Sequence, residues 1–117
     1  MIYHKDLEGR FKNLSIFEQM ANTGAEVGRA INWRGKNIEF SKKAFYRALE
    51  LFDFTADDPK NKNSLKEILR AREVFCDYYA GDNVYHSNDE GWNKYFYHFT
   101  VAARKGVKLI HPPGVWV

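Results

Sequence analysis

The sequence repeats one helix-start pattern three times, a serine followed three residues later by a glutamate, at 15–18, 64–67 and 87–90. In a capping box the serine side chain accepts a hydrogen bond from a first-turn amide, and the glutamate side chain accepts one from the serine amide. Each pair precedes apolar residues spaced three and four apart, the period of an amphipathic helix. The pattern therefore predicts three helix N-termini.

A fourth helix start is predicted at Ser41, a favourable N-cap residue before another apolar stripe. Gly81 and Gly106 are natural helix ends. No segment long enough to build a sheet alternates with period two. The sequence thus predicts an all-α protein, a four-helix up-and-down bundle with short connections, whose helices cover about 16–33, 42–56, 65–80 and 89–105.

The chain of 117 residues has a length that suits one domain over residues 1–117. Pro112 and Pro113 cannot continue a helix, so we expect residues 106–117 to form an extended C-terminal tail.

Gly24 and Gly28 lie in the middle of the first predicted helix, where each glycine costs about 1 kcal/mol relative to alanine. On a helical wheel they flank the apolar stripe together with Ala21. A phosphate-binding glycine loop would instead lie between a strand and a helix. We therefore predict that both glycines let the backbone of another helix approach closely.

Composition narrows the class of protein. The single cysteine, Cys76, allows no internal disulfide, which fits a reducing compartment. No apolar run approaches the roughly 20 residues of a membrane span, and the first residues, MIYHKDLEGRF, are charged where a signal peptide is apolar. We expect a cytoplasmic protein with no membrane partner.

The four histidines are scattered, and no glutamate has a histidine three residues later, as the di-iron helical bundles require. We therefore expect no metal and no cofactor. The HEPN ribonucleases are small helical bundles in which an arginine precedes a histidine in one helix, whereas here His98 precedes Arg104. We expect no enzymatic activity and identify no catalytic residue, with a small helical ribonuclease as the remaining alternative.

The segments EQMANTGAEVGRAI, AFYRALELFDFTADDPKNK, LKEILRAREVFCDYYAGDN and KYFYHFTVAAR resemble a group of short, uncharacterised bacterial and archaeal helical proteins. The resemblance covers roughly residues 14–104. It implies a helical fold and carries over no activity and no catalytic residue.

Arg72 falls at the centre of the apolar face of the third predicted helix, between Leu69 and Phe75. A buried guanidinium requires a partner carboxylate. We expect a buried ion pair of Arg72 with Asp53, with Asp77 as a second possible partner, or an arginine that extends past the edge of the core. An anion anchor inside the bundle is the functional alternative.

Every predicted helix also carries apolar residues outside its main stripe, which exceeds what one bundle can hide. They predict a protein interface, most simply that of a homo-oligomer. The candidate interface residues are Trp33, Tyr46, Phe54, Val74, Tyr78, Tyr97 and Val101.

The net charge of +3 is mild, so attraction to nucleic acid depends on how the charges are distributed. An up-and-down bundle brings the starts of the first and third helices and the ends of the second and fourth to one end. The candidate nucleic-acid-binding residues at this basic end are Arg10, Lys12, Lys60, Lys62, Lys66, Arg104, Lys105 and Lys108.

These patterns together predict a non-enzymatic interaction or adaptor protein that self-associates and binds a protein partner. The alternative is an accessory nucleic-acid-binding protein that uses the basic end.

Overall fold

The computed structural model describes residues 5–105, and the side chains of residues 8–105. All of its regular structure is helical, which confirms the predicted all-α class for the described part of the chain. The elements in order are α1 (Lys5–Lys12), α2 (Ile16–Trp33), α3 (Ile38–Asp57), the 3-10 helix η1 (Pro59–Ser64), α4 (Leu65–Ala80) and α5 (Asp89–Lys105). The predicted tail, 106–117, lies outside the described residues.

The helix starts follow the predicted capping pattern at one of three places. Ser15 forms the complete capping box: its Oγ accepts from the Glu18 amide at 3.1 Å, and its own amide donates to Glu18 Oε1 at 3.0 Å. Ser64 makes no side-chain capping bond, because η1 leads directly into α4. At α5 the acceptor is Asn88, whose Oδ1 takes the Gly91 amide at 2.7 Å.

The start of α3 differs from the prediction. Asn37 is its N-cap, and the side-chain oxygen accepts from the amides of Glu39 and Phe40 at 3.1 and 3.2 Å. Ser41, predicted to be the cap, is buried one turn inside the helix, where its hydroxyl donates to Ala30 O of α2 at 2.6 Å. This serine therefore fastens two helices together instead of starting one.

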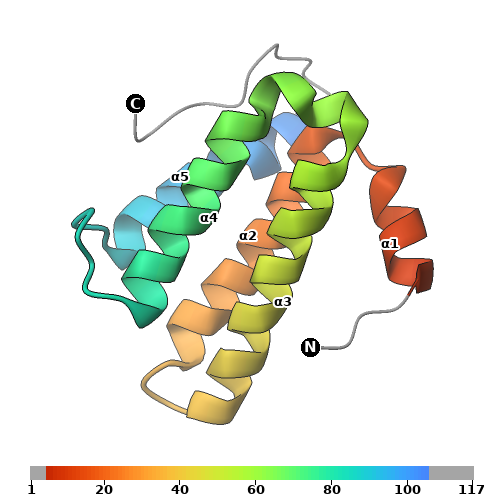
Figure 1. Ribbon diagram of the computed structural model, residues 1–117. Coiled ribbons are helices and arrows are strands. Elements are labelled where there is room, and N and C mark those ends of the chain that lie inside the picture. The colour runs from red at the N-terminus through yellow and green to blue at the C-terminus, as the bar shows by residue number, and fades with distance from the viewer. Residues whose placement is uncertain (1–4, 106–117) are drawn as a thin grey trace.

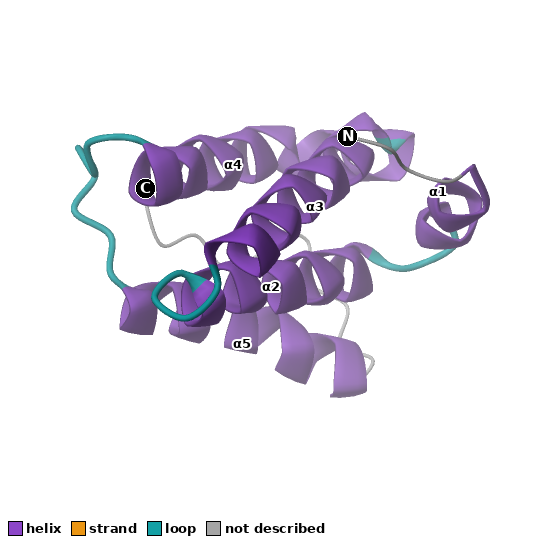
Figure 2. Cartoon of the chain, turned by 90° about the horizontal axis from the view of Figure 1, so that it is seen from below, coloured by secondary structure: helices purple, strands orange, loops and turns teal. Residues whose placement is uncertain are grey.

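The four long helices lie side by side, with α2 between α3 and α5, and α4 against the far side of α3 (Figures 1 and 2). The start of α2, the end of α3, η1, the start of α4 and the end of α5 point to one end of the molecule. None of the described helices is both long and apolar enough to cross a membrane.

Aromatic rings fill the centre of the assembly. The Trp92 ring of α5 meets the Phe75 ring of α4 edge-on at 5.5 Å between centroids and stacks on Phe96 at 5.8 Å. On the α3 side, Phe45 stacks on Tyr79 at 4.2 Å. Each buried aromatic side chain of this size contributes roughly 2–3 kcal/mol, so the rings supply much of the stability of the core.

The two mid-helix glycines have different environments. A Cβ at Gly24 would lie 2.5 Å from Phe96 Cγ, so the glycine allows α5 to approach α2 at this point, as predicted. A Cβ at Gly28 would meet nothing within 4 Å. The predicted packing role is therefore wrong for Gly28, because α5 does not pass over that position.

The helix α1, which the sequence pattern did not predict, lies on the flank of the α2–α3 pair, on the side away from the α4–α5 connection (Figures 1 and 2). Its Phe11 is 3% exposed and forms a small separate core with Leu51 and Phe54 of α3, against which Leu14 packs. The Phe11 and Phe54 rings lie 6.1 Å apart. This helix covers only the end of the α2–α3 seam where α3 finishes.

Candidate functional site

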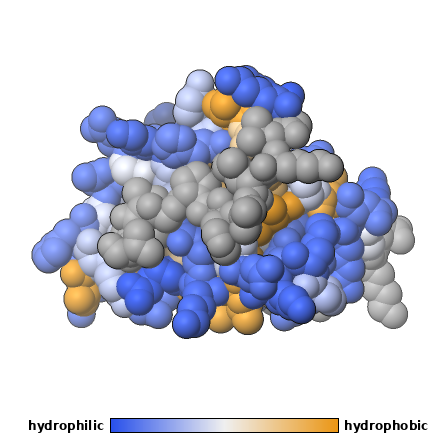
Figure 3. Space-filling model, turned by 90° about the horizontal axis from the view of Figure 1, so that it is seen from above, coloured by the Kyte–Doolittle hydropathy of each residue, from blue (hydrophilic) through white to orange (hydrophobic). Residues whose placement is uncertain are grey.

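The residues of the predicted basic end separate into two groups in the structure. Lys62 and Lys66, near the start of α4, and Arg104 and Lys105, at the end of α5, are exposed at the same end of the molecule. Figure 3 looks onto this end, where the visible described residues are mostly hydrophilic. Lys108 lies outside the described residues.

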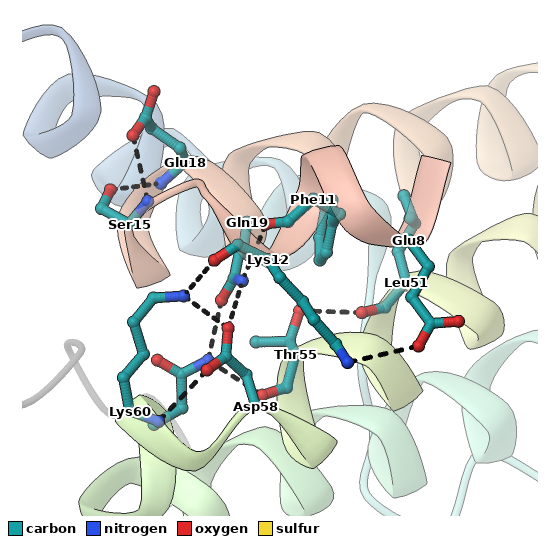
Figure 4. Close-up of polar contacts among 11 residues, drawn as sticks. Glu8, Phe11, Lys12, Ser15, Glu18, Gln19, Leu51, Thr55, Asp58 and Lys60 are labelled. Carbon is teal, nitrogen blue, oxygen red and sulfur yellow. Dashed lines mark hydrogen bonds and ion pairs between the residues drawn. The ribbon is translucent and has the colours of Figure 1, made fainter. Parts of the chain in front are cut away.

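The other three cations of the predicted basic end are engaged in contacts. Lys12 pairs with Glu8 one turn earlier at 3.4 Å. Lys60 Nζ donates to Lys12 O at 2.8 Å and pairs with Asp58 (Figure 4). Arg10 lines a hollow beside α2 and is also engaged in a polar or electrostatic contact within the protein. Of these cations, Lys60 joins η1 to α1, and Lys12 and Lys60 are both paired with carboxylates of the protein itself.

Gln19 is the centre of a buried polar network beneath this end (Figure 4). Its Nε2 donates to Phe11 O and to Asp58 Oδ2, both at 3.0 Å, and its Oε1 accepts from Asn61 Nδ2 at 2.7 Å. The Asn61 amide also donates to Thr55 O at 2.9 Å. Since both the nitrogen and the oxygen of the Gln19 side-chain amide have hydrogen-bond partners, the network has a structural role and connects α1, α2 and η1.

Asp58 carries the negative charge of this network. Burial acts to raise its pKa, but hydrogen bonds from Lys60 and Gln19 outweigh burial and hold the pKa below its usual value. The carboxylate is therefore ionised at neutral pH with its acceptors occupied, and it stabilises the fold where η1 begins.

Arg72 forms the predicted pair with Asp53, with Arg72 Nε donating to Asp53 Oδ1 at 2.8 Å. The predicted burial is wrong: the two side chains are 33% and 54% exposed. The buried face of α4 consists of Ile68, Ala71, Val74 and Phe75, which rotates Arg72 and Leu69 out of the core. Because Arg72 lies outside the core and is paired with Asp53, it does not form an anion-binding site inside the bundle.

Two of the predicted interface residues are core residues. Val74 is 0% exposed within the main core. Phe54 is 6% exposed because α1 covers it. The prediction placed them outside because it assumed one buried stripe on each helix, whereas α3 is covered by α1 on one flank and by α2 and α4 elsewhere. Tyr78 and Val101 are partly buried.

The three most exposed candidates lie on three different seams between helices. Trp33 is 40% exposed at the α2–α3 seam, and Tyr97 is 63% exposed at the α2–α5 seam. Tyr46, 52% exposed, lies two turns before Asp53 on the face of α3 that reaches α4. The candidates therefore do not combine into one interface.

The α2–α5 seam has a hollow of about 260 Å³ beside Tyr97. Its lining is alanine, glycine, valine, asparagine, threonine and aromatic residues, without a charged side chain: Ala21, Gly24, Ala25, Val27, Trp92, Asn93, Phe96, Tyr97 and Thr100.

The α2–α3 seam, in contrast, is lined by several charged side chains. Two hollows of about 330 and 290 Å³ lie end to end along the seam and are together called the groove; they share Glu26, Arg29 and Arg47, whose ion pairs lie between them. Glu26 is 7% exposed and pairs with Arg29 on its own helix and with Arg47 Nε of α3 at 3.7 Å. The sequence analysis missed this groove. Its signal was the row of cations and aromatics on α2 and α3 that lies off the core stripe.

Two carboxylates of α4, those of Asp77 and Glu73, hold the α4–α5 connection. Asp77 accepts the amides of Val84 and Tyr85 at 3.0 and 3.1 Å, and its backbone oxygen accepts those of Gly81 and Asn83. The Tyr85 hydroxyl donates to Glu73, and this bond raises the pKa of the phenol. These bonds fix the position of the loop on α4.

No group of three or more potential metal ligands occurs among the residues that the structure describes. Cys76 is partly buried against the core, and burial raises the pKa of its thiol. Tyr95, buried with its hydroxyl donating to Glu67 at 2.8 Å, has its pKa raised by burial first and by that carboxylate second. Both groups therefore remain protonated at neutral pH. In this form neither is an effective nucleophile or base.

Comparisons with protein-family models, with curated proteins and with solved structures found no match to this chain.

Proposed function

We propose that this protein is a non-enzymatic interaction module, built as an up-and-down bundle of α2 to α5, that self-associates and binds a protein partner. The observation that carries the proposal is the hollow at the α2–α5 seam, whose lining has no charged side chain and includes Tyr97, 63% exposed. In a twofold dimer the same patch of both subunits meets, so an uncharged patch avoids like-charge repulsion. An exposed tyrosine beside a hollow is also typical of interface hot spots.

The test compares two tyrosines that are similarly exposed. Light scattering and sedimentation of the wild-type protein at roughly tens of micromolar should give a mass above that of the monomer. Tyr97→Glu should return the mass to the monomer, because it places a charge in the uncharged contact. Tyr46→Glu, on the α3–α4 face, should leave the oligomer intact. A monomeric wild type, or equal dissociation by both substitutions, contradicts the proposal.

A second candidate function is nucleic-acid binding, and the exposed Lys62, Lys66, Arg104 and Lys105 at one end favour it. If these side chains neutralise about four phosphates, the logarithm of the affinity for single-stranded RNA should fall with the logarithm of salt at a slope of roughly −3. Changing Lys62 and Lys66 to glutamine should flatten the slope by about one to two units. Absence of RNA binding in about 50 mM salt rules this candidate out.

A further inference from the structure

We infer that the groove along the α2–α3 seam is a docking site for an acidic amphipathic helix of a partner protein, an inference that rests on the proposed role as an interaction module. The groove runs from Asn22 to Trp33 on α2. These eleven residue steps span about 16 Å at 1.5 Å per residue, the length of about three helical turns.

The charges on the rim of the groove indicate which sign of charge the partner carries. Three cationic side chains, Arg29, Lys43 and Arg47, line the groove against one carboxylate, that of Glu26; Arg10, at the α1 end, is engaged in other contacts. Glu26 is itself buried under Arg29 and Arg47, so that its charge is used in holding these arginines in place. The outward-facing charge of the rim is therefore positive, which favours an acidic partner.

The floor of the groove is apolar, so the partner also needs an apolar face. Phe11, Leu14, Ala25 and Leu51 line one half, and Ala44 lies under the other. At its far end Trp33 and Phe40 are 40% and 52% exposed. An amphipathic helix with apolar residues at i, i+3, i+4 and i+7 would bury this floor while its acidic residues reach the rim.

The protein itself contains a helix on this seam. α1 lies over the end where α3 finishes and places Phe11 against Leu51 and Phe54. Phe11 and Leu51 also line the open groove, so the open part continues an existing helix-binding surface without a break. The seam is thus shaped for helix packing, and α1 occupies only one end of it.

Other occupants fit the groove less well. A second copy of the chain would bring two positive rims together, and self-association is better placed at the α2–α5 hollow, whose lining has no charged side chain. Nucleic acid could contact the cations through its phosphates, but stacking of a base in the groove would also need a free ring face. The Trp33 ring already meets the Phe40 ring edge-on at 5.5 Å, and Lys36 Nζ lies 6.0 Å from the centre of the same ring.

The probe is a synthetic peptide of about 16 residues with leucine at i, i+3, i+4 and i+7 and glutamate on its other faces. Titrated into isotopically labelled protein in about 50 mM salt, it should shift the backbone resonances of Ala25, Arg29, Trp33 and Phe40, and leave those of α4 in place. A peptide of the same composition in scrambled order, and one with lysine replacing glutamate, should each bind at least about tenfold more weakly.

Neighbouring lysines provide the matched variants. Lys43 lines the groove, whereas Lys42, also exposed, does not. Lys43→Glu should weaken binding about fivefold, because an exposed attraction is lost and a repulsion is gained. Lys42→Glu makes the same change in net charge and should have little effect.

The inference is overturned if the acidic peptide causes no shifts at about 1 mM, if the scrambled peptide binds equally, or if both lysine variants behave alike. It is also overturned if a single-stranded oligouridylate shifts the same groove resonances while the peptide does not. Sedimentation of the same samples keeps the two proposals separate: dissociation by Tyr97→Glu supports self-association whether or not the groove binds the peptide.

Discussion

Gly24→Ala and Gly28→Ala should change the stability of the protein in opposite directions, although both glycines lie in the interior of α2. In each case alanine gains about 1 kcal/mol of helix propensity. At Gly28 nothing lies within 4 Å of the new methyl group, so the gain should be retained in full. Gly28→Ala is therefore expected to raise the free energy of unfolding by about 1 kcal/mol.

At Gly24 the new methyl group would lie 2.5, 2.6 and 2.7 Å from Phe96 Cγ, Cβ and Cδ1. Phe96 cannot yield easily, because it is 6% exposed and its ring stacks on Trp92. Overpacking costs about 1–3 kcal/mol, and contacts this short place the substitution at about 2–3 kcal/mol, so after the propensity gain the net loss should be about 1–2 kcal/mol. The two variants should then differ by about 2–3 kcal/mol.

Urea unfolding followed by far-ultraviolet circular dichroism measures this difference. With a denaturant slope of about 1–2 kcal/mol per molar, the two midpoints should lie about 1–3 M apart on either side of the wild type. The protein concentration should be low enough for the mass to be monomeric, since Gly24 also lines the proposed self-association surface. A Gly24→Ala protein as stable as the wild type, or a destabilised Gly28→Ala protein, would refute the packing argument.

Two further predictions concern charged side chains. Arg72→Ala should cost at most about 1 kcal/mol in urea unfolding, because its pair with Asp53 is exposed to solvent; a loss near 3 kcal/mol would show that the pair is buried. Asp58→Asn should cost about 1.5–3 kcal/mol at neutral pH by weakening the bonds from Lys60 and Gln19. Since the native pKa of Asp58 lies below its usual 3.8, the stability from its carboxylate is fully present above that value and is lost as pH falls through the native pKa. The difference in unfolding free energy between wild type and Asp58→Asn should therefore shrink below about pH 4, and a difference independent of pH would contradict this role.

The sequence predicted the bounds of α2, α4 and α5 because apolar periodicity and local end signals agree in these helices. α1 was missed because its eight residues, KDLEGRFK, are mostly charged and include a glycine, and the helix depends on one tertiary anchor, Phe11. Three of the four expected starts differed, each for a local or tertiary reason that the serine pattern does not carry. Ser41 bonds to α2, η1 runs directly into α4 at Ser64, and Asn88 accepts the first-turn amide of α5 in place of Ser87.

The surfaces were harder to predict than the helices. A helical wheel separates one face from another, but it does not say which neighbouring helix covers the second face. For this reason Phe54 and Val74 were taken as exposed, and Arg72 as buried. The Gln19 network joins residues about forty positions apart, and its signal in the sequence was a glutamine on the apolar stripe of α2.

The weak attachment of α1 makes its release less costly in free energy than unfolding of the whole protein. Releasing α1 exposes Phe11 and breaks the bond from Gln19 to Phe11 O, a loss of about 3–4 kcal/mol that the conformational entropy regained by α1 partly offsets, so the opening costs less than the roughly 5–15 kcal/mol of global unfolding. Native-state hydrogen exchange should accordingly show the amides of α1 exchanging through a sub-global opening, while those of α2 exchange only with the whole fold. In the opened state Leu51 and Phe54 lose their cover, so the length of apolar seam that a competing helix can reach is governed by the same equilibrium.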